Sequence, residues 1–384
     1  MRNVSHHGKI VQAYRASRLG ISQEELGKRV GKSRRTIVTI EQMAYIDEVR
    51  LRRTLAWALQ IPPELLDLPD DTLPQVPIFH PLETPSVAQS EHLSRTVFDT
   101  FTDNLRMRFH LYYLGSSLSA AEYLESHIEM LTQRAHASRA KDLPSFLRLL
   151  SHNYQLKGLI ARDQLGYEEA EQSFQQASLF AQQAECAALA ALAMGRQAVL
   201  YVMQGRDPDA GLLYETAREM TKHSPVALRA YLAIGHAEAQ GKLGDEKCLL
   251  SLTEARSLTQ RIDTEDDDLL LFHSTRCSDR AVEDCWAQCH AFIGKPVIAI
   301  EHYDKLERKL DLSMTRMRAR LGIQYAEALY AAKDLSCCFY ITEGVKLAQT
   351  THSCYNLHRA MALAHKMRSQ HPHDSRVKDM FKSF

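Results

Sequence analysis

The chain has 384 residues, 45% of them hydrophobic, and its 47 lysines and arginines balance its 47 aspartates and glutamates. This length allows two or three domains with buried cores. No run approaches the roughly 18 apolar residues of a membrane span, and the N-terminus lacks an apolar signal core. The eight cysteines are too scattered for a secreted disulfide framework. We therefore expect a cytoplasmic protein with reduced thiols.

Residues 22–41 predict two short helices joined by a tight turn. Ser22 is a suitable N-cap for the first helix, and Glu25 is placed to complete a capping box with it. Leu26 and Val30 then fall on one face of this helix, four residues apart. Gly31 is expected to supply the turn.

The second helix is predicted to begin after Ser33, another good N-cap. Its apolar residues Ile37 and Ile40 point back toward the first helix, and Gly27 is expected where the two helices cross and only a small residue fits. The outward positions are basic or polar: Arg34, Arg35 and Thr39. Two arginines therefore open an exposed helix.

Residues 8–66 resemble the Cro/repressor-type (xenobiotic-response-element) helix-turn-helix family. The resemblance is carried by the motif at residues 22–26, by Gly27, Gly31, Ile37 and Ile40, and by a tail over residues 55–66 similar to the family's fourth and short fifth helices. It implies a five-helix, lambda-repressor-like domain that binds double-stranded DNA. A helical hairpin that only packs is the alternative.

Within such a domain, an arginine early in the recognition helix can contact guanine O6 and N7, whereas Gln23 is expected to meet a phosphate. The predicted DNA-binding residues are Gln23, Lys28, Arg29, Lys32, Ser33, Arg34, Arg35, Thr36 and Thr39. The charge distribution agrees with this partner: residues 1–66 hold 12 basic and 6 acidic side chains, so the remainder carries a net charge of −6. A basic module neutralises phosphates, and an acidic one is repelled by them.

The composition changes abruptly between Asp67 and Pro85, where five of the chain's twelve prolines fall within nineteen residues. Neither a helix nor a central strand tolerates this spacing. We therefore predict a DNA-binding domain over residues 1–67, a stiff proline-rich linker over 68–86 and a second domain over 87–384.

Beyond residue 90 the sequence predicts an all-α domain, because apolar residues recur at spacings of three and four and strand signals are nearly absent. A pattern of small, large and small residues at offsets of four and three follows Gly166 and returns about 40 residues later. The five sets are Ala170, Phe174, Ala177; Ala210, Tyr214, Ala217; Cys248, Leu252, Ala255; Ala299, Tyr303, Leu306; and Cys338, Thr342, Val345. The spacing resembles the tetratricopeptide repeat, which implies stacked helix pairs with a concave groove. An irregular helical domain is the alternative.

A Cro/repressor-type head followed by such a body resembles the RRNPP regulators. This resemblance implies a homodimer on an inverted-repeat operator and a peptide or protein effector, as in quorum sensing. The predicted effector-groove residues are Asn153, Gln155, Arg162, Gln240, Gln288, Glu327 and Tyr330. The alternative function is a tetratricopeptide adaptor whose head contacts protein instead of DNA.

One cluster of thiols and imidazoles has two cysteines a helical turn apart, a spacing that can bind zinc or oxidise. Its members are His273, Cys277, Cys285, Cys289 and His290. Small cysteines more often occupy buried helical faces, so we expect no metal. The acidic run at residues 263–268 lacks the glycine of a calcium loop. No phosphate loop, metalloprotease motif or nucleophile elbow is present, so we expect neither an enzyme nor a cofactor.

Overall fold

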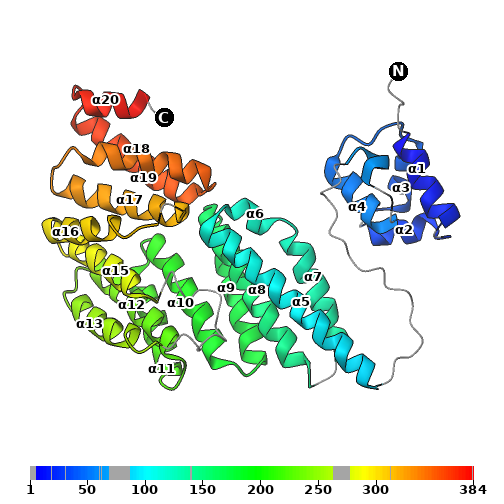
Figure 1. Cartoon of the computed structure of the whole chain (residues 1–384), viewed down its shortest axis with the longest axis horizontal. Helices are drawn as coiled ribbons and strands as arrows, with labels where there is room; N and C mark the ends of the chain where they lie inside the picture. The colour runs from blue at the N-terminus through cyan, green and yellow to red at the C-terminus, as the bar shows by residue number, and fades with distance from the viewer. Residues whose placement is uncertain are drawn as a thin grey trace. The chain divides into compact units, whose positions relative to one another are not determined.

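All regular secondary structure in the computed structural model is helical, with no strand among the residues that it describes (Figure 1). These are residues 6–18, 20–30, 32–59, 61, 63–68, 87–138, 141–262, 277–311, 313–382 and 384. Gly31, the proline-rich stretch from residue 69 to 86, the acidic run and His273 lie outside them. The chain divides into two compact units, residues 1–86 and 87–384.

The first unit packs short helices around one apolar core. Its elements are α1 (His7–Ala13), a π-helical turn (Tyr14–Arg18), α2 (Gln23–Arg29), α3 (Arg34–Gln42), α4 (Val49–Leu59) and a 3-10 turn (Pro63–Leu66). Leu26, Val30, Ile37 and Ile40 are buried in this core, together with Leu55 of α4. The apolar spacing of residues 22–41 therefore produces the inward faces that it predicts.

Helix α1 begins against the end of α3. The backbone N–H groups of His7 and Gly8 donate to the carbonyls of Ala44 and Met43, each at 3.1 Å. A Cβ atom on Gly8 would lie 2.6 Å from three carbonyl oxygens at the end of α3. No larger residue fits there unless the backbone moves, so this contact fixes the position of α3 within the unit.

The second unit is a series of longer helices. It contains α5 (Val87–Leu114), α6 (Ser117–Ala121), α7 (Leu124–Ala137), α8 (Leu143–Asp163), α9 (Tyr167–Gln183), α10 (Ala187–Met203), α11 (Asp207–Met220), α12 (Val226–Lys242), α13 (Cys248–Thr259), α15 (Asp279–Phe292), α16 (Pro296–Glu307), α17 (Thr315–Ala331), α18 (Cys337–Thr350), α19 (Cys354–Gln370) and α20 (Ser375–Lys382). From α8 onward, consecutive helices pack as pairs that follow one another along the unit, from green to red in Figure 1.

The first helix of several pairs ends in the same way. One residue adopts a left-handed conformation, and the following N–H donates to the carbonyl five residues back, which is the Schellman arrangement. After α8 the left-handed residue is Leu165, and the Gly166 N–H donates to the Ala161 carbonyl at 2.8 Å. Glycine takes the left-handed position after α10, α12 and α15, at Gly205, Gly244 and Gly294. The chain reverses at each of these points, because the left-handed residue cannot continue the helix.

The repeated small and large residues lie between the helices. Every member of the first four predicted sets is buried. A Cβ atom on Gly158 of α8 would lie 2.6 Å from the ring of Phe174, so the aromatic side chain of α9 fills the space that the glycine leaves. Tyr214 of α11 contacts Gly235 of α12 in the same manner.

The fifth set is out of register by one residue. Thr342 is only half-buried, whereas Cys337 and Ile341 are completely buried. The predicted Cys338 and Val345 are also buried, but the completely buried positions follow the register of Cys337, Ile341 and Gly344. The first buried position of α18 comes four residues after the left-handed Lys333, whereas in α9 it comes five residues after Leu165.

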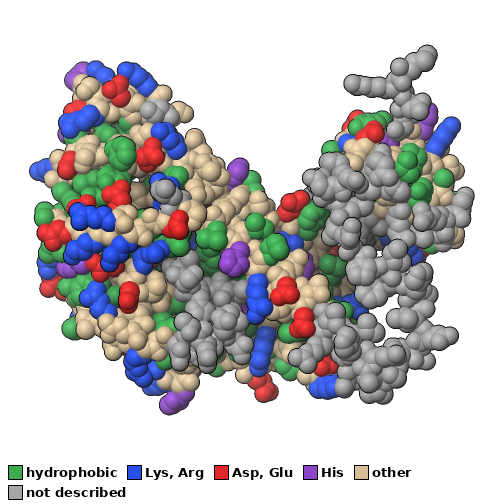
Figure 2. Space-filling model, in the orientation of Figure 1, with side chains coloured by type: hydrophobic (Ala, Val, Ile, Leu, Met, Phe, Trp, Pro, Cys, Tyr) green, Lys and Arg blue, Asp and Glu red, His purple; other side chains and the backbone are tan. Residues whose placement is uncertain are grey.

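None of the described helices contains a stretch long and apolar enough to cross a bilayer. Figure 2 shows acidic and basic side chains interspersed over the visible face of α15 to α18, with no large area of one sign. Ion pairs join the α12–α13 pair to the α15–α16 pair: Lys295 binds Glu246 at 2.6 Å, and Arg256 binds Glu283 at 3.1 Å. Such exposed pairs contribute little stability, so the packed helices hold the unit together.

Candidate functional site

Helices α2 and α3 form the candidate nucleic-acid interface. The Ser22 hydroxyl caps α2 by accepting a hydrogen bond from the Glu25 N–H at 3.1 Å, and Ser33 caps α3 through the Thr36 N–H at the same distance. Both caps agree with the sequence. The Glu25 carboxylate accepts a hydrogen bond from Arg29 at 3.3 Å, and it makes no return bond to Ser22 within the described residues.

Residue 27 of α2 lies against the connection to α3, where there is no room for a side chain. Gly27 is buried, and a Cβ atom there would lie 2.6 Å from the carbonyl oxygen of Lys32. The Gly27 carbonyl accepts a hydrogen bond from the Lys32 N–H at 2.9 Å. The glycine thus allows the backbone of the connection, at Lys32, to lie directly against α2.

A buried carboxylate, Glu41, fixes α3 to the neighbouring segments. Arg15 donates to it from Nε at 2.5 Å and from Nη2 at 3.3 Å, and donates to the Ile21 carbonyl at 2.8 Å. Gln23 of α2 donates from Nε2 to Glu41 Oε2 at 2.8 Å. The Gln23 carboxamide, which the sequence assigns to a phosphate, therefore uses one N–H to join α2 to α3.

The basic side chains around this connection are exposed. They are Lys28, Arg29, Lys32, Arg34 and Arg35. Lys28 and Arg29 pair with carboxylates four residues earlier in α2, at 3.4 and 3.3 Å, but exposed pairs of this kind contribute at most about 1 kcal/mol. For Lys32, Arg34 and Arg35 the described residues provide no ion pair. All five cations are therefore available to a nucleic acid.

The two faces of α3 differ sharply in chemistry. Ile37 and Ile40 have exposed fractions of 0% and 1%, whereas Arg34, Arg35 and Thr39 are exposed on the opposite side. The threonine and serine hydroxyls are held locally: Thr39 donates to the Arg35 carbonyl at 3.1 Å, and Ser33 Oγ lies 2.8 Å from Thr36 Oγ1. Helix α3 thus presents a basic surface on a rigid support.

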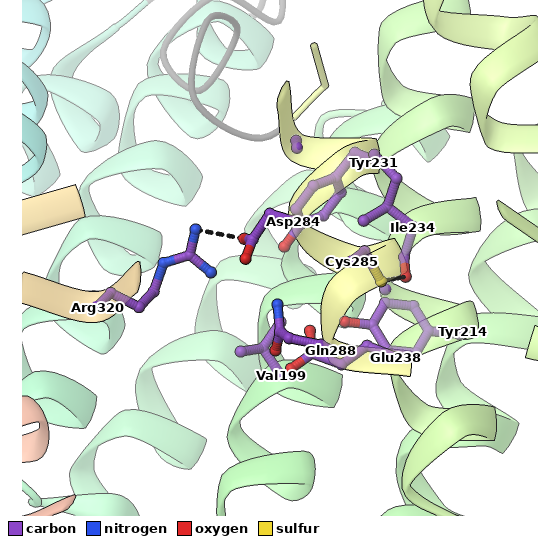
Figure 3. Close-up of a pocket in the computed structure, with 11 residues that line it drawn as sticks. Val199, Tyr214, Tyr231, Ile234, Glu238, Asp284, Cys285, Gln288 and Arg320 are labelled. Atoms are coloured by element: carbon purple, nitrogen blue, oxygen red, sulfur yellow. Dashed lines mark hydrogen bonds and ion pairs between the residues drawn. The ribbon is translucent and has the colours of Figure 1, made fainter. Parts of the chain in front are cut away.

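The second candidate site is a cavity of about 130 Å³ in the second unit. A side lobe of about 20 Å³ shares four of its lining residues, and Figure 3 draws the lining of this lobe. The lining of the cavity and its lobe comes mainly from the first helices of the pairs, α8, α10, α12, α15, α17 and α19, and from α5. The charged lining residues are Arg162, Arg196, Arg316, Arg320, Arg359, Asp163, Glu238 and Asp284. One face of each first helix therefore contributes to a common, strongly charged inner surface.

Three of these arginines form ion pairs between helices. Arg316 binds Asp163 at 2.8 Å, Arg320 binds Asp284 at 2.6 Å (Figure 3), and Arg359 binds Glu327 through two bonds at 2.6 and 2.5 Å. Burial disfavours the charged form of Arg316, but the neighbouring Tyr112 and Asp163 outweigh this effect, and the pKa of Arg316 is raised. The three ion pairs connect α8, α15, α17 and α19.

Tyr355 of α19 lies among these charges. Burial raises the pKa of its phenol; Arg359 and Arg162 lower this pKa, and Glu327 and Glu238 raise it further. The tyrosine is therefore close enough to Arg162 and Glu238 to sense both charges. These three side chains, from α19, α8 and α12, face the same cavity.

Two of the seven predicted groove residues line the cavity. Arg162 contributes to the main chamber and Gln288 to the side lobe, where Figure 3 shows it near Glu238. Glu327 lies behind the lining as the partner of Arg359.

The other four predicted groove residues do not reach the cavity, which corrects their assignment. Asn153 and Gln155 are completely buried, where their amides donate to the Leu149 carbonyl at 2.8 Å and the Ser151 hydroxyl at 3.3 Å. Gln240 accepts a hydrogen bond from Ser251 of α13 at 2.8 Å. Tyr330 packs against the core of the last helix pairs. On α8 the cavity reaches only the last turns, at Leu159, Arg162 and Asp163, so Asn153 and Gln155 lie outside it.

Sequence reasoning missed most of the charged lining, because charged helical residues are normally solvated. A usable signal was present in α10, where Arg196 and Gln197 interrupt a run of otherwise apolar residues. Both are buried in the structure. Arg316 and Arg320 give a second signal, since their spacing of four places both on one face of α17.

The early and late helices of the second unit also meet beside the cavity, in a set of polar contacts that we call the seam. Ser353 donates to Asp163 at 2.6 Å, and the His352 carbonyl accepts hydrogen bonds from Gln164 at 2.7 Å and Ser117 at 3.2 Å. Arg316 contributes through its pair with Asp163. The seam joins segments about 190 residues apart in sequence, so the concave surface expected from the sequence is bridged on one side.

The thiol cluster lies in the packing between α12, α13 and α15. The Sγ atoms of Cys285 and Cys289 are 3.9 Å apart and donate to the carbonyls of Ile234 and Ala237, each at 3.4 Å. Hydrogen bonds with Cys248 and Cys285, together with burial, raise the pKa of Cys289. Within the described residues, no group of three histidines, cysteines, aspartates or glutamates is arranged to hold a metal. The cysteines therefore act as small core side chains.

No protein-family model matches the chain, and a search of curated proteins found no relative. The function must therefore be inferred from the chemistry of the two sites. The first site offers an exposed basic helix on a rigid support, and the second offers a partly open cavity lined by charges of both signs.

Proposed function

We propose that the chain is a sequence-specific DNA-binding transcriptional regulator. In this proposal the first unit is a Cro/repressor-type helix-turn-helix domain, and the second is a tetratricopeptide-like domain that dimerises and senses an effector. The observation that carries the proposal is the outer face of α3, where Arg34 and Arg35 are exposed at the start of the helix while Ile37 and Ile40 anchor its inner face. An arginine so placed matches the guanine edge in the major groove.

The surrounding charges support the same partner. Lys28, Arg29 and Lys32 flank the start of α3 and are exposed, so they are positioned for phosphates on either side of a groove. Residues 1–66 carry a net charge of +6, which favours counterion release from DNA. In this arrangement phosphate contacts set the register, and α3 reads the bases.

The cavity of the second unit supports the sensor part of the proposal. Six successive helix pairs contribute to one region, and three ion pairs connect the first helices of four of them. A ligand bound there contacts several pairs at once. Binding can therefore favour one arrangement of the pairs over another and, in a dimer, one separation of the DNA-binding domains.

An adaptor function is the second candidate, because the first unit also exposes apolar side chains. Met43, Tyr45 and Val49, between the end of α3 and the start of α4, have exposed fractions of 40%, 43% and 44%. Exposed apolar side chains that form a patch are typical of protein contacts. The salt dependence separates the two functions, since affinity for DNA falls steeply as salt concentration rises.

The proposal is tested by selecting binding sites from a random pool of duplex DNA with the full chain. We expect enrichment of an inverted repeat whose half-sites are about 34 Å apart, roughly one helical turn. The affinity for the selected site should fall with salt concentration. A pool that stays random at low salt contradicts the DNA-binding function and favours the adaptor.

A further inference from the structure

The cavity contains a charged side chain with no internal partner. Arg162, near the end of α8, is only 8% exposed and lines the main chamber. Neither a hydrogen bond nor an ion pair connects its guanidinium to any of the described residues, whereas Arg316, Arg320 and Arg359 are each paired with a carboxylate. A buried cation without a counterion is costly unless a ligand supplies one.

Acceptor groups in the same chamber also lack partners. Gln324 Oε1 and Asn356 Oδ1 are buried, and neither accepts a hydrogen bond within the part of the chain that the structure describes. Glu238 of α12 lines both the chamber and its side lobe and forms no ion pair among the described residues. Buried polar groups are almost always satisfied, so the two amide oxygens indicate a ligand that donates hydrogen bonds. The half-buried Glu238 carboxylate in the same chamber favours a ligand group with positive charge.

The unsatisfied groups therefore have both signs. Arg162 is placed to bind an anion, and Glu238 with the two amide oxygens is placed to bind a cationic donor such as an ammonium group. Tyr355 adds a hydroxyl close to both charges. A guanidinium binds a carboxylate through two parallel hydrogen bonds, and an ammonium group has three N–H donors for the acceptors.

The main chamber has a volume of about 130 Å³ and is partly open to solvent, so it has room for a small molecule. The seam bridges one side of the concave surface beside it. A compact zwitterion fits both the volume and the pattern of charges.

We propose that this cavity binds a free α-amino acid, with its carboxylate on Arg162 and its ammonium group at Glu238. That the amino acid acts as the effector rests on the proposed regulator function. That it binds in this cavity depends only on the second unit.

The test measures the melting temperature of the full chain with each of the twenty standard L-α-amino acids, followed by calorimetry. We expect at least one amino acid to raise the melting temperature and to bind with one equivalent per chain. Its α-carboxamide and its N-acetyl derivative should each bind at least about ten-fold more weakly, because each removes one charge. Trialanine, which separates the two charges, should not bind.

Variants assign the two charges. Arg162→Gln and Glu238→Gln should each weaken binding about ten-fold or more. Arg162→Lys should weaken binding less, because lysine keeps the positive charge but lacks the two parallel N–H donors of a guanidinium. Arg148→Gln, which changes an exposed arginine on the same helix, is the matched control and should bind normally. Circular dichroism confirms that each variant is folded.

Three results overturn the inference: no amino acid stabilises the chain, the carboxamide or the N-acetyl derivative binds as tightly as the parent, or folded Arg162→Gln matches Arg148→Gln. Tighter binding of trialanine than of any amino acid would show that the site accepts peptide termini instead. DNA binding by the unliganded chain is measured separately, so a failure here is distinguishable from a failure of the regulator function.

Discussion

At the scale of residues, glycines mark where helices approach too closely for a side chain. Gly158 of α8 lies against the ring of Phe174, where a Cβ atom would be 2.6 Å from the nearest ring carbon. Gly211 of α11, by contrast, has no atom within 4 Å of the position that a Cβ would take. Both glycines lie within helices of the second unit, so they form a matched pair.

Gly158→Ala should lower the free energy of unfolding by about 1 to 3 kcal/mol, because the new methyl group overpacks the α8–α9 contact. Gly211→Ala should raise it by up to about 1 kcal/mol, since alanine favours a helix and meets open space. Urea unfolding measures both effects. Equal effects of the two substitutions would contradict the packing described for this pair of helices.

Two histidines of the second unit make stability depend on pH. Burial lowers the pKa of His152 to about 3, with a further contribution from Arg196, and burial with Arg108 lowers the pKa of His127 to about 4. Below pH 6.5 the unfolded chain therefore binds protons that the folded chain does not.

The free energy of unfolding should accordingly fall as the pH is lowered from 7 toward 4, by up to about 1.4 kcal/mol per pH unit for each histidine. His152→Gln removes one of these protonation sites and should flatten the dependence by about that amount. Urea unfolding at several pH values tests this. An unchanged slope would show that His152 is protonated equally in both states.

At the scale of elements, the seam depends on one carboxylate. Asp163 accepts hydrogen bonds from Ser353 and pairs with Arg316, so it connects α8 with α17 and the start of α19. Both members of the ion pair are at most 10% exposed. Removing one partner of a buried pair leaves the other charge uncompensated.

Asp163→Asn should therefore lower the free energy of unfolding by about 3 to 5 kcal/mol and speed amide hydrogen exchange around residues 351–356. Asp209→Asn breaks an exposed pair with Arg206 and should cost less than about 1 kcal/mol. Hydrogen exchange by mass spectrometry separates local from global effects. If exchange at the seam stays normal in the Asp163 variant, the pair does not hold these helices together.

The elements also show what the sequence could predict. The caps Ser22 and Ser33, the inward face of α3 and four of the five repeat sets follow from interactions within a few residues, which a sequence pattern contains. The cavity was found only in part, through Arg162 and Gln288. Its ion pairs join different helix pairs, from 32 to 153 residues apart in the chain, and no local pattern records which residue of another helix neutralises an arginine.

At the scale of the whole molecule, the proposed regulator should be a homodimer, because one small DNA-binding domain makes too few contacts for tight binding at cellular salt. We expect the second unit to supply most of the interface. Residues 87–384, which form a compact unit, should therefore sediment as a dimer at micromolar concentration. A monomer under these conditions would place the interface elsewhere.

The central claim is that α3 reads DNA sequence, and single substitutions on its outer face test it most directly. The measurement is the affinity of the full chain for its selected site and for random duplex DNA, at several salt concentrations. Lys9→Ala, on exposed α1, removes the same charge outside α3 and is the matched control.

We expect Arg35→Ala to cost about 1 to 3 kcal/mol per half-site and to relax the preference at one base pair, with a similar loss for Arg34→Ala. Lys32→Ala should weaken all sequences alike and reduce the salt slope by about one per subunit. If Arg34→Ala and Arg35→Ala are folded and both bind the selected site as tightly as Lys9→Ala does, α3 is not the recognition helix, and the proposed function is wrong.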